Sequence, residues 1–224
     1  MEMMKDIHWL GHDAFRIDSG GIVIYTDPFR IKKADKGRPA PKADLILITH
    51  EHYDHCSPED VDEISGENTV ILAPPDCAGK FSRGELKIVK PGDKLTAAGV
   101  EVEVVPAYNI NKKFHPKQNR WVGYIFTAGG HRIYIAGDTD YIPEMNGFRA
   151  DIALLPVSGT YVMTAEEAAQ AALDIKPEIA VPMHYGSVVG TREDAARFAK
   201  TLEEKISGKI LEGKIKAAIL EHEG

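Results

Sequence analysis

Four residues that commonly bind metal ions lie close together in the chain. His50, His52, Asp54 and His55 form the pattern His-x-His-x-Asp-His, directly after the apolar run at residues 45–48. Such a run predicts a buried strand, and the polar segment after it predicts a turn. Neutral imidazoles and an ionised carboxylate suit Zn, Mn or Fe. The spacing therefore indicates a metal site, because a solvated surface turn does not require four candidate ligands.

Two further candidate ligands follow later apolar runs. Asp138 comes after residues 132–136 and Gly137, and His184 comes directly after residues 179–183. Both positions end a predicted strand, and glycine permits the turn that would present Asp138. Asp138 could otherwise belong to an ordinary turn, and an isolated His184 could be structural. Because the pattern at residues 50–55 already indicates a metal site, both are predicted to be ligands.

The pattern at residues 50–55 resembles the motif that opens the dinuclear site of the metallo-β-lactamase fold superfamily. Similarity to one branch, the UlaG-like or UPF0173 group of metal-dependent hydrolases, extends through the segments at residues 9–12, 26–29, 137–139 and 182–185. The resemblance covers most of the chain. It implies an α/β fold, a four-layer αββα sandwich with the site at one edge of two sheets.

The resemblance also implies roles for single residues. Asp138 would bridge two ions, and His184 would be the last ligand. Asp27 would support a ligating histidine, since a carboxylate that accepts the second imidazole N–H fixes the orientation of the ring. Simple Asp-Pro turn chemistry is the alternative for Asp27, which precedes Pro28.

One ligand that the resemblance leads us to expect is absent from its usual place. Most members carry a histidine after the strand that corresponds to residues 102–108, where this chain has Asn109. A neutral amide oxygen is a poor ligand for Zn or Fe. His115 stands further along the chain and is predicted to fold back and take that position. The alternatives are a solvated loop histidine or a site of reduced affinity.

Other histidines and both cysteines carry weaker signals. His12 could line the pocket as a proton donor or a substrate contact, or it could be structural. No role is assigned to the remaining histidines, which are His8, His131 and His222. Cys56 adjoins the metal motif, but a small buried residue is the favoured reading for it over a thiolate ligand. With Cys56 and Cys77 as the only cysteines and no secretory signal pattern, a reducing cytoplasm is expected.

Strand and helix signals agree with a layered α/β fold. Short apolar runs at residues 7–10, 14–17 and 22–25 predict a meander that opens a sheet. Helix starts are indicated by Ser57 before Pro58, by the capping box that begins at Thr164, and by Thr191 before an amphipathic stretch at residues 192–206. Residues 31–42 predict an exposed loop. No linker is evident, so residues 1–224 are expected to form a single domain.

Composition limits the classes of partner. The chain has 224 residues, 43% hydrophobic content and a net charge of -7, which argues against a standing nucleic-acid surface. A basic loop with Lys112, Lys113, Lys117 and Arg120 could attract a phosphate, although a solvated loop is the ordinary reading. No apolar stretch approaches a membrane span. The expected partner is a small-molecule substrate, with a homo-oligomer as a further option.

These observations predict a metal-dependent hydrolase that uses two divalent ions, with Zn expected and Mn or Fe as alternatives. His50, His52 and His115 would hold one ion, while Asp54, His55 and His184 would hold the other. Asp138 would lie between the ions, and Asp54 could instead orient the attacking water. The predicted reaction cleaves an ester-like bond in a lactone, phosphodiester or cyclic phosphate. The alternatives are a superfamily nuclease or RNA-processing protein, and a weakly catalytic metal-binding protein.

Overall fold

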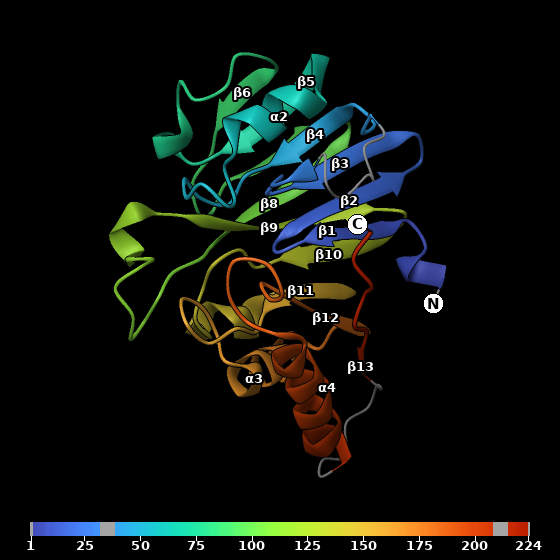
Figure 1. Cartoon of the computed structure of the whole chain (residues 1–224), viewed down its shortest axis with the longest axis vertical. Helices are drawn as coiled ribbons and strands as arrows, with labels where there is room; N and C mark the ends of the chain where they lie inside the picture. The colour runs from blue at the N-terminus through green and yellow to red at the C-terminus, as the bar shows by residue number, and fades with distance from the viewer. Residues whose placement is uncertain (1, 32–38, 208–214, 224) are drawn as a thin grey trace.

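The computed structural model describes residues 2–31, 39–207 and 215–223 (Figure 1). Within this part of the chain, the strands form two sheets. The six-stranded sheet has the order β1 to β6, in which the strands are Ile7–Gly11, Ala14–Ser19, Ile22–Thr26, Ala43–Leu47, Ser65–Ala73 and Glu85–Ile88. The seven-stranded sheet runs from β13 back to β7, and these strands in chain order are Lys94–Ala97, Val100–Pro106, Val122–Ala128, His131–Ile135, Ile152–Pro156, Ile179–Met183 and Lys216–Ala217.

Each sheet is antiparallel in its first part and parallel in its second. The predicted meander is confirmed, because β1, β2 and β3 pair antiparallel, and β3 to β6 then pair in parallel. In the second sheet β7 to β10 are antiparallel, and β10 to β13 are parallel. The parallel strands β11 and β12 are buried along their whole length. This burial explains their continuous apolar sequences, since both faces of a central parallel strand are covered.

Helices cover the outer faces of the two sheets, which gives the expected αββα order of layers. Helix α2 (Pro58–Ile64) packs on the first sheet, and helices α3 (Ala165–Ile175) and α4 (Arg192–Ser207) pack on the second. The main core lies between the sheets. Alternation along β4 shows why: Leu45 and Leu47 belong to this core, whereas Ile46 belongs to a separate cluster with Val61 of α2. Short 3-10 helices at Glu2–Met4, Pro75–Cys77, Lys117–Asn119 and Pro143–Gly147 complete the described elements.

The helix starts lie where the capping residues predict them. The Ser57 hydroxyl accepts a hydrogen bond from the Asp60 N–H at 3.3 Å, and Pro58 is the first residue of α2. At α3, Thr164 and Glu167 form a complete capping box. These bonds satisfy amide groups that the first turn of a helix leaves without partners.

The expectation of an exposed loop at residues 31–42 is wrong at its first residue, Ile31, whereas residues 39, 41 and 42 are exposed. Residues 32–38 lie outside the described residues, but Ile31 is fully buried rather than exposed. Its backbone N–H donates to Asp60 Oδ1 at 2.9 Å, and its side chain joins the apolar cluster beneath α2. Cys56 and Cys77 are free, buried thiols, as expected for small packing residues. No helix among the described residues is both long and apolar enough to cross a membrane.

Candidate metal centre

Strand direction brings the candidate ligands together. Because β1 and β3 both pair antiparallel with β2, and β4 is parallel to β3, all three end at the same edge of their sheet. In the other sheet β8, β10 and β12 share one direction for the same reason. The segments that leave these carboxyl ends carry the predicted site residues, which are His12, Asp27, the 50–55 motif, Asn109, Asp138 and His184. Side chains at the ends of parallel strands converge, as is usual for sites in α/β folds.

The first group of histidines consists of His50, His52 and His115, whose ring nitrogens lie within 4.8 Å of one another. His50 Nε2 and His52 Nδ1 are 3.0 Å apart. His115 Nε2 lies 3.2 Å from Asp138 Oδ2. The chain therefore places His115 beside the two motif histidines, where it was predicted to fold back.

The second group gathers around the other oxygen of the same carboxylate. His55 Nε2 lies 3.3 Å from Asp138 Oδ1, and His184 Nε2 lies 3.2 Å from that atom. Asp54 adjoins this group through His12, whose Nε2 is 3.2 Å from Asp54 Oδ2. Asp138 thus stands between two sets of imidazoles, with one oxygen facing each set.

Hydrogen bonds to the opposite ring nitrogens leave the inward nitrogens free. His55 Nδ1 donates to Asp27 Oδ2 at 2.8 Å, and His184 Nδ1 lies 2.8 Å from Ser158 Oγ. His115 Nδ1 lies 3.2 Å from Asn109 Oδ1. In the neutral form that binds metal, the ring proton lies on Nδ1 and each Nε2 would present a lone pair toward the cluster. Partners of this kind fix the tautomer and the orientation of ligating histidines.

The inward-facing atoms fit a bound cation. Of the described buried atoms, Nε2 of His55, His115 and His184 and Oδ1 of Asp138 make no hydrogen bond. In the neutral form of the rings, their lone pairs would face carboxylate oxygens, an arrangement that is unfavourable unless a proton or a metal ion lies between them. A tetrahedral ion with bonds of about 2.0–2.1 Å needs donor atoms about 3.3 Å apart. The distances from the Asp138 oxygens to Nε2 of His55, His115 and His184 are 3.2–3.3 Å, close to this value, whereas His50 Nε2 lies 4.0 Å away.

Asp27 holds the motif segment in place. Its carboxylate accepts the backbone N–H of Thr49 at 2.8 Å and the Thr49 hydroxyl at 2.6 Å, in addition to His55. Thr49 Oγ1 in turn lies 3.0 Å from His50 Nδ1. One buried carboxylate therefore orients two histidines of the motif, one directly and one through a hydroxyl.

Three residues of the site have left-handed backbone conformations. The φ angles are 52° at His12, 37° at Asp27 and 60° at His184. Residues other than glycine adopt this region at a cost of about 1–3 kcal/mol, and such strain concentrates at functional sites. The backbone is held there by its contacts, since His184 N–H donates to the His12 carbonyl at 3.2 Å and Asp27 N–H donates to the Leu47 carbonyl at 3.0 Å.

Burial and neighbouring charges set the protonation states. Burial lowers the pKa of His50 well below its usual value, and the charge of His55 adds to this effect. Burial alone would raise the pKa of Asp138, but when no metal is bound the protonated His184 and His55 hold it well below its ordinary value. Asp138 in turn raises the pKa of both histidines against the effect of burial. Burial also lowers the pKa of His12 to about 4, despite its bond to Asp54. An ionised Asp138 and a neutral His50 are the forms that ligate metals.

Asn109 does not face the cluster as a ligand. Its Oδ1 accepts the His115 backbone N–H at 3.0 Å, and its Nδ2 donates to Asp140 Oδ1 at 3.1 Å and to the Tyr161 carbonyl at 2.9 Å. Asp140 also accepts the backbone N–H of Ile110. The amide therefore fixes the loop that presents His115, which a histidine at position 109 could not do with the same bonds.

Several residues of the site were not singled out from the sequence. Asp13 is completely buried, its two oxygens make no hydrogen bond in the described structure, and burial raises its pKa to about 7. Its oxygen lies 3.9 Å from His55 Nδ1. Trp121 packs against the rings of His50, His52 and His115 at centroid distances of 4.9, 4.8 and 5.4 Å. The available signals were the position of Asp13 directly after His12 and that of Asp140 two residues after Asp138.

Comparisons with known proteins identify the family of the chain. Residues 6–184 match the family model described as the beta-lactamase superfamily domain. A UPF0173 metal-dependent hydrolase from Thermoplasma acidophilum is 36% identical over 210 residues, which cover 88% of this chain and 90% of the relative. A UPF0173 metal-dependent hydrolase from Methanopyrus kandleri is 30% identical over 212 residues, with 88% and 91% covered.

Solved structures share the fold. A Parabacteroides distasonis protein superposes with a TM-score of 0.79 at 36% identity, covering 95% of this chain and 91% of its own. Igni18, a metallo hydrolase from Ignicoccus hospitalis, gives a TM-score of 0.74 at 25% identity, with 96% and 94% covered. The family match spans well over half of the chain and includes the motif at residues 50–55. The chain belongs to the UPF0173 metal-dependent hydrolase family of the metallo-β-lactamase superfamily.

Proposed function

We propose that this hydrolase is dinuclear and cleaves an ester-like bond in a small molecule, such as a lactone, a phosphodiester or a cyclic phosphate. The observation that carries the proposal is the position of Asp138, whose two oxygens each face a separate set of imidazoles. His50, His52 and His115 would hold one ion, and Asp54, His55 and His184 would hold the other. Zn is favoured by the number of imidazole donors, and Mn or Fe would accept the same set.

Two ions at this position would supply a water that ionises near neutral pH and would polarise the scissile carbonyl or phosphoryl oxygen. The protein's own residues provide the rest. In the alternative role, Asp54 would orient the attacking water instead of binding the ion, since it is a partly exposed carboxylate held by His12, at side-chain exposures of 13% and 1%. Because burial lowers its pKa to about 4, His12 is neutral, and its Nε2–H donates to the ionised Asp54 carboxylate and holds that carboxylate in place.

The alternative of a weakly catalytic metal-binding protein was motivated by Asn109. The position of His115 counts against this alternative, since three imidazoles rather than two would be available to hold the first ion. The basic loop also offers little unpaired positive charge for binding nucleic acid. Lys112 is paired with Asp140 at 2.5 Å, and Lys117 is paired with Glu144 at 3.0 Å.

The first prediction is that hydrolysis depends on the motif histidines. Changing His50→Ala together with His52→Ala should remove bound metal and abolish activity against the responsive members of a panel of lactones, phosphomonoesters, phosphodiesters and cyclic phosphates. The loss should be at least about a thousandfold in kcat/KM, because the water would no longer be activated. His131→Ala, at the start of β10, is the matched control. Full activity in the metal-free double variant would remove the mechanism.

A further inference from the structure

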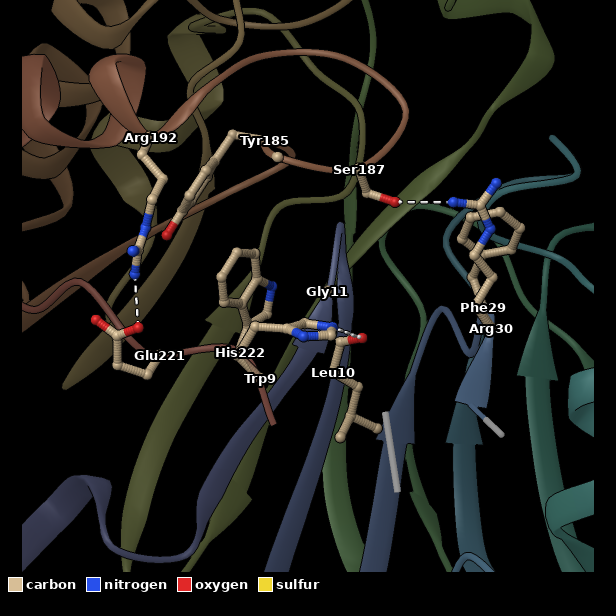
Figure 2. A pocket seen from close by; sticks show the side chains of 11 residues that line it. Trp9, Leu10, Gly11, Phe29, Arg30, Tyr185, Ser187, Arg192, Glu221 and His222 are labelled. Carbon is tan, nitrogen blue, oxygen red and sulfur yellow. Dashed lines mark hydrogen bonds and ion pairs between the residues drawn. The ribbon is translucent and has the colours of Figure 1, made fainter. Parts of the chain in front are cut away.

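A pocket of about 460 Å³ lies beside the candidate metal centre. Its walls are the end of β1, the segment after β3, the segment after β12 and the C-terminal residues, as Figure 2 shows. Gly11 and Tyr185 line it, and they adjoin His12 and His184 in the chain. The ring of Phe29, another lining residue, lies 6.4 Å from the His12 ring. None of the seven predicted ligands lines the pocket, so its lining is distinct from the ligand cluster that it adjoins.

One wall carries a buried hydroxyl without a partner. Tyr185 is only 1% exposed, and among the described residues its Oη has no hydrogen-bond partner. In Figure 2 this hydroxyl points into the pocket, on the side where Arg192 and Glu221 lie. A buried polar group is normally hydrogen-bonded. An unpartnered hydroxyl that lines a cavity therefore indicates a ligand that accepts a hydrogen bond from it.

Charge in the pocket points to the nature of that ligand. Arg192 and Arg30 stand on opposite sides of it (Figure 2), whereas the carboxylate among its lining residues is that of Glu221. This local excess of positive charge contrasts with the net charge of -7 for the chain. Guanidinium groups bind carboxylate and phosphate oxygens through two parallel hydrogen bonds.

The present partners of the two arginines can be exchanged. Arg192 Nη2 donates to Glu221 Oε2 at 2.6 Å, but the side chains are 65% and 83% exposed. Such an exposed ion pair contributes little to stability. Arg30 Nη1 donates to Ser187 Oγ at 3.3 Å, and its guanidinium lies over the Phe29 ring at 4.7 Å. A ligand anion could therefore replace Glu221 at Arg192 without breaking a buried contact.

Aromatic groups form the base of the pocket. The rings of Trp9 and Tyr185 pack at a centroid distance of 4.8 Å, and His222 meets Trp9 edge to face at 5.8 Å. His222 Nε2 donates to the Leu10 carbonyl at 2.9 Å, which fixes the C-terminal segment against β1. The volume is in the range of sites for small organic molecules. The lining thus combines a flat apolar surface with donors for an oxyanion.

We propose that this pocket binds an anionic group, a carboxylate or a phosphate, on the non-reacting part of the substrate. The Tyr185 hydroxyl would donate to the anion and Arg192 would pair with it, while Arg30 would contribute at the opposite wall. The inference rests on the proposed function, because the bond to be cleaved would lie at the neighbouring His/Asp cluster. It adds to that function a substrate class: esters or lactones that carry a separate anionic group.

Binding can be measured without turnover. Isothermal titration calorimetry of the metal-loaded protein with phenylphosphonate and with benzoate distinguishes the two anion types. Tyr185→Phe and Arg192→Gln should each weaken binding of the preferred anion by about tenfold or more, the usual loss for a hydrogen bond to a charged group. Glu221→Gln should tighten it severalfold, because it frees Arg192 from its competitor. This opposite sign does not arise from a folding defect.

Matched variants identify the bound site. Tyr134→Phe removes another fully buried, unpartnered hydroxyl, and Arg197→Gln removes an exposed arginine elsewhere on α4; neither should alter binding. Anion binding should also persist in the His50→Ala, His52→Ala double variant. Loss of binding only in that double variant would place the anion at the metal ligands and overturn the inference, as would undetectable binding of both probes. Persistent anion binding without hydrolysis of any panel member would instead count against the proposed function.

Discussion

A histidine binds a transition metal through one ring nitrogen. The hydrogen-bond partner of the other nitrogen fixes the tautomer and the orientation of the ring. At this site the partners come from several elements: Asp27 follows β3, Thr49 follows β4, and Ser158 follows β11. Each accepts or shares a proton at Nδ1 and leaves Nε2 facing Asp138. The ligand geometry is therefore a property of residues outside the His-x-His-x-Asp-His pattern as much as of the pattern itself.

The second prediction concerns His115. His115→Ala should lower bound metal from about two ions per chain toward one, because the first group would keep only two imidazoles. Turnover should fall with it. Inductively coupled plasma mass spectrometry after dialysis measures the stoichiometry. His131→Ala provides the control, as a partly exposed histidine at the start of β10. Unchanged stoichiometry in His115→Ala would make this histidine a bystander.

At the scale of elements, local sequence signals and long-range contacts differ in what they predict. The strands could be predicted from apolar runs and two helix starts from the caps at Ser57 and Thr164, since these signals are local. The packing of the C-terminal segment on β1 could not. It depends on the Glu223 N–H donating to the Trp9 carbonyl and on a two-residue strand, β13. His222 consequently received no role, although it lines the pocket beside the site.

The same distinction applies to the loop that carries His115. The sequence indicated that this histidine could reach the site, because Asn109 was unsuited to ligate. It did not indicate how the loop would be held. That depends on Asp140, which accepts hydrogen bonds from the side chain of Asn109 and the backbone of Ile110. Such a network joins two loops from different strands and leaves no periodic signal in either.

The third prediction tests the turn that presents Asp138. Gly137 has φ 62°, and a Cβ there would lie 2.8 Å from the Thr49 side chain. Gly130 has φ 79° in a hairpin turn, with open space around the position of a Cβ. Gly130→Ala should therefore cost only about 1–2 kcal/mol for the left-handed conformation. Gly137→Ala should cost about 2–5 kcal/mol, because overpacking adds to the same strain.

Urea denaturation of both glycine variants measures these costs. Thr49 also donates to Asp27, so the displaced side chain in Gly137→Ala should reduce metal affinity, whereas Gly130→Ala should leave it unchanged. Equal destabilisation by the two substitutions would show that close packing of Gly137 on Thr49 does not constrain the turn.

At the scale of the whole molecule, the candidate centre joins the two sheets. His50 to His55 leave the first sheet after β4, whereas Asp138 and His184 leave the second sheet after β10 and β12. The apolar core holds the sheets together elsewhere, but at this edge the facing groups are buried imidazoles and carboxylates, and several of their described atoms make no hydrogen bond. Bound cations would convert this edge from a weak part of the interface into a link between the sheets.

The fourth prediction follows from that link. An ion that binds only the folded state, at a free concentration about a hundredfold above its dissociation constant, adds about 2.7 kcal/mol to the free energy of unfolding. In a chain of this size each kcal/mol raises the melting temperature by about 2–4 °C, so chelation should lower it by about 5–10 °C for each ion that it removes. Hydrogen exchange should show which backbone amides lose protection on chelation. The segments after β4, β10 and β12 should lose protection together, while α4, packed on the far side of the second sheet, should keep it. Loss of protection confined to the segment after β4 would mean that metal binding involves the first sheet alone, and Asp138 and His184 would then not be ligands.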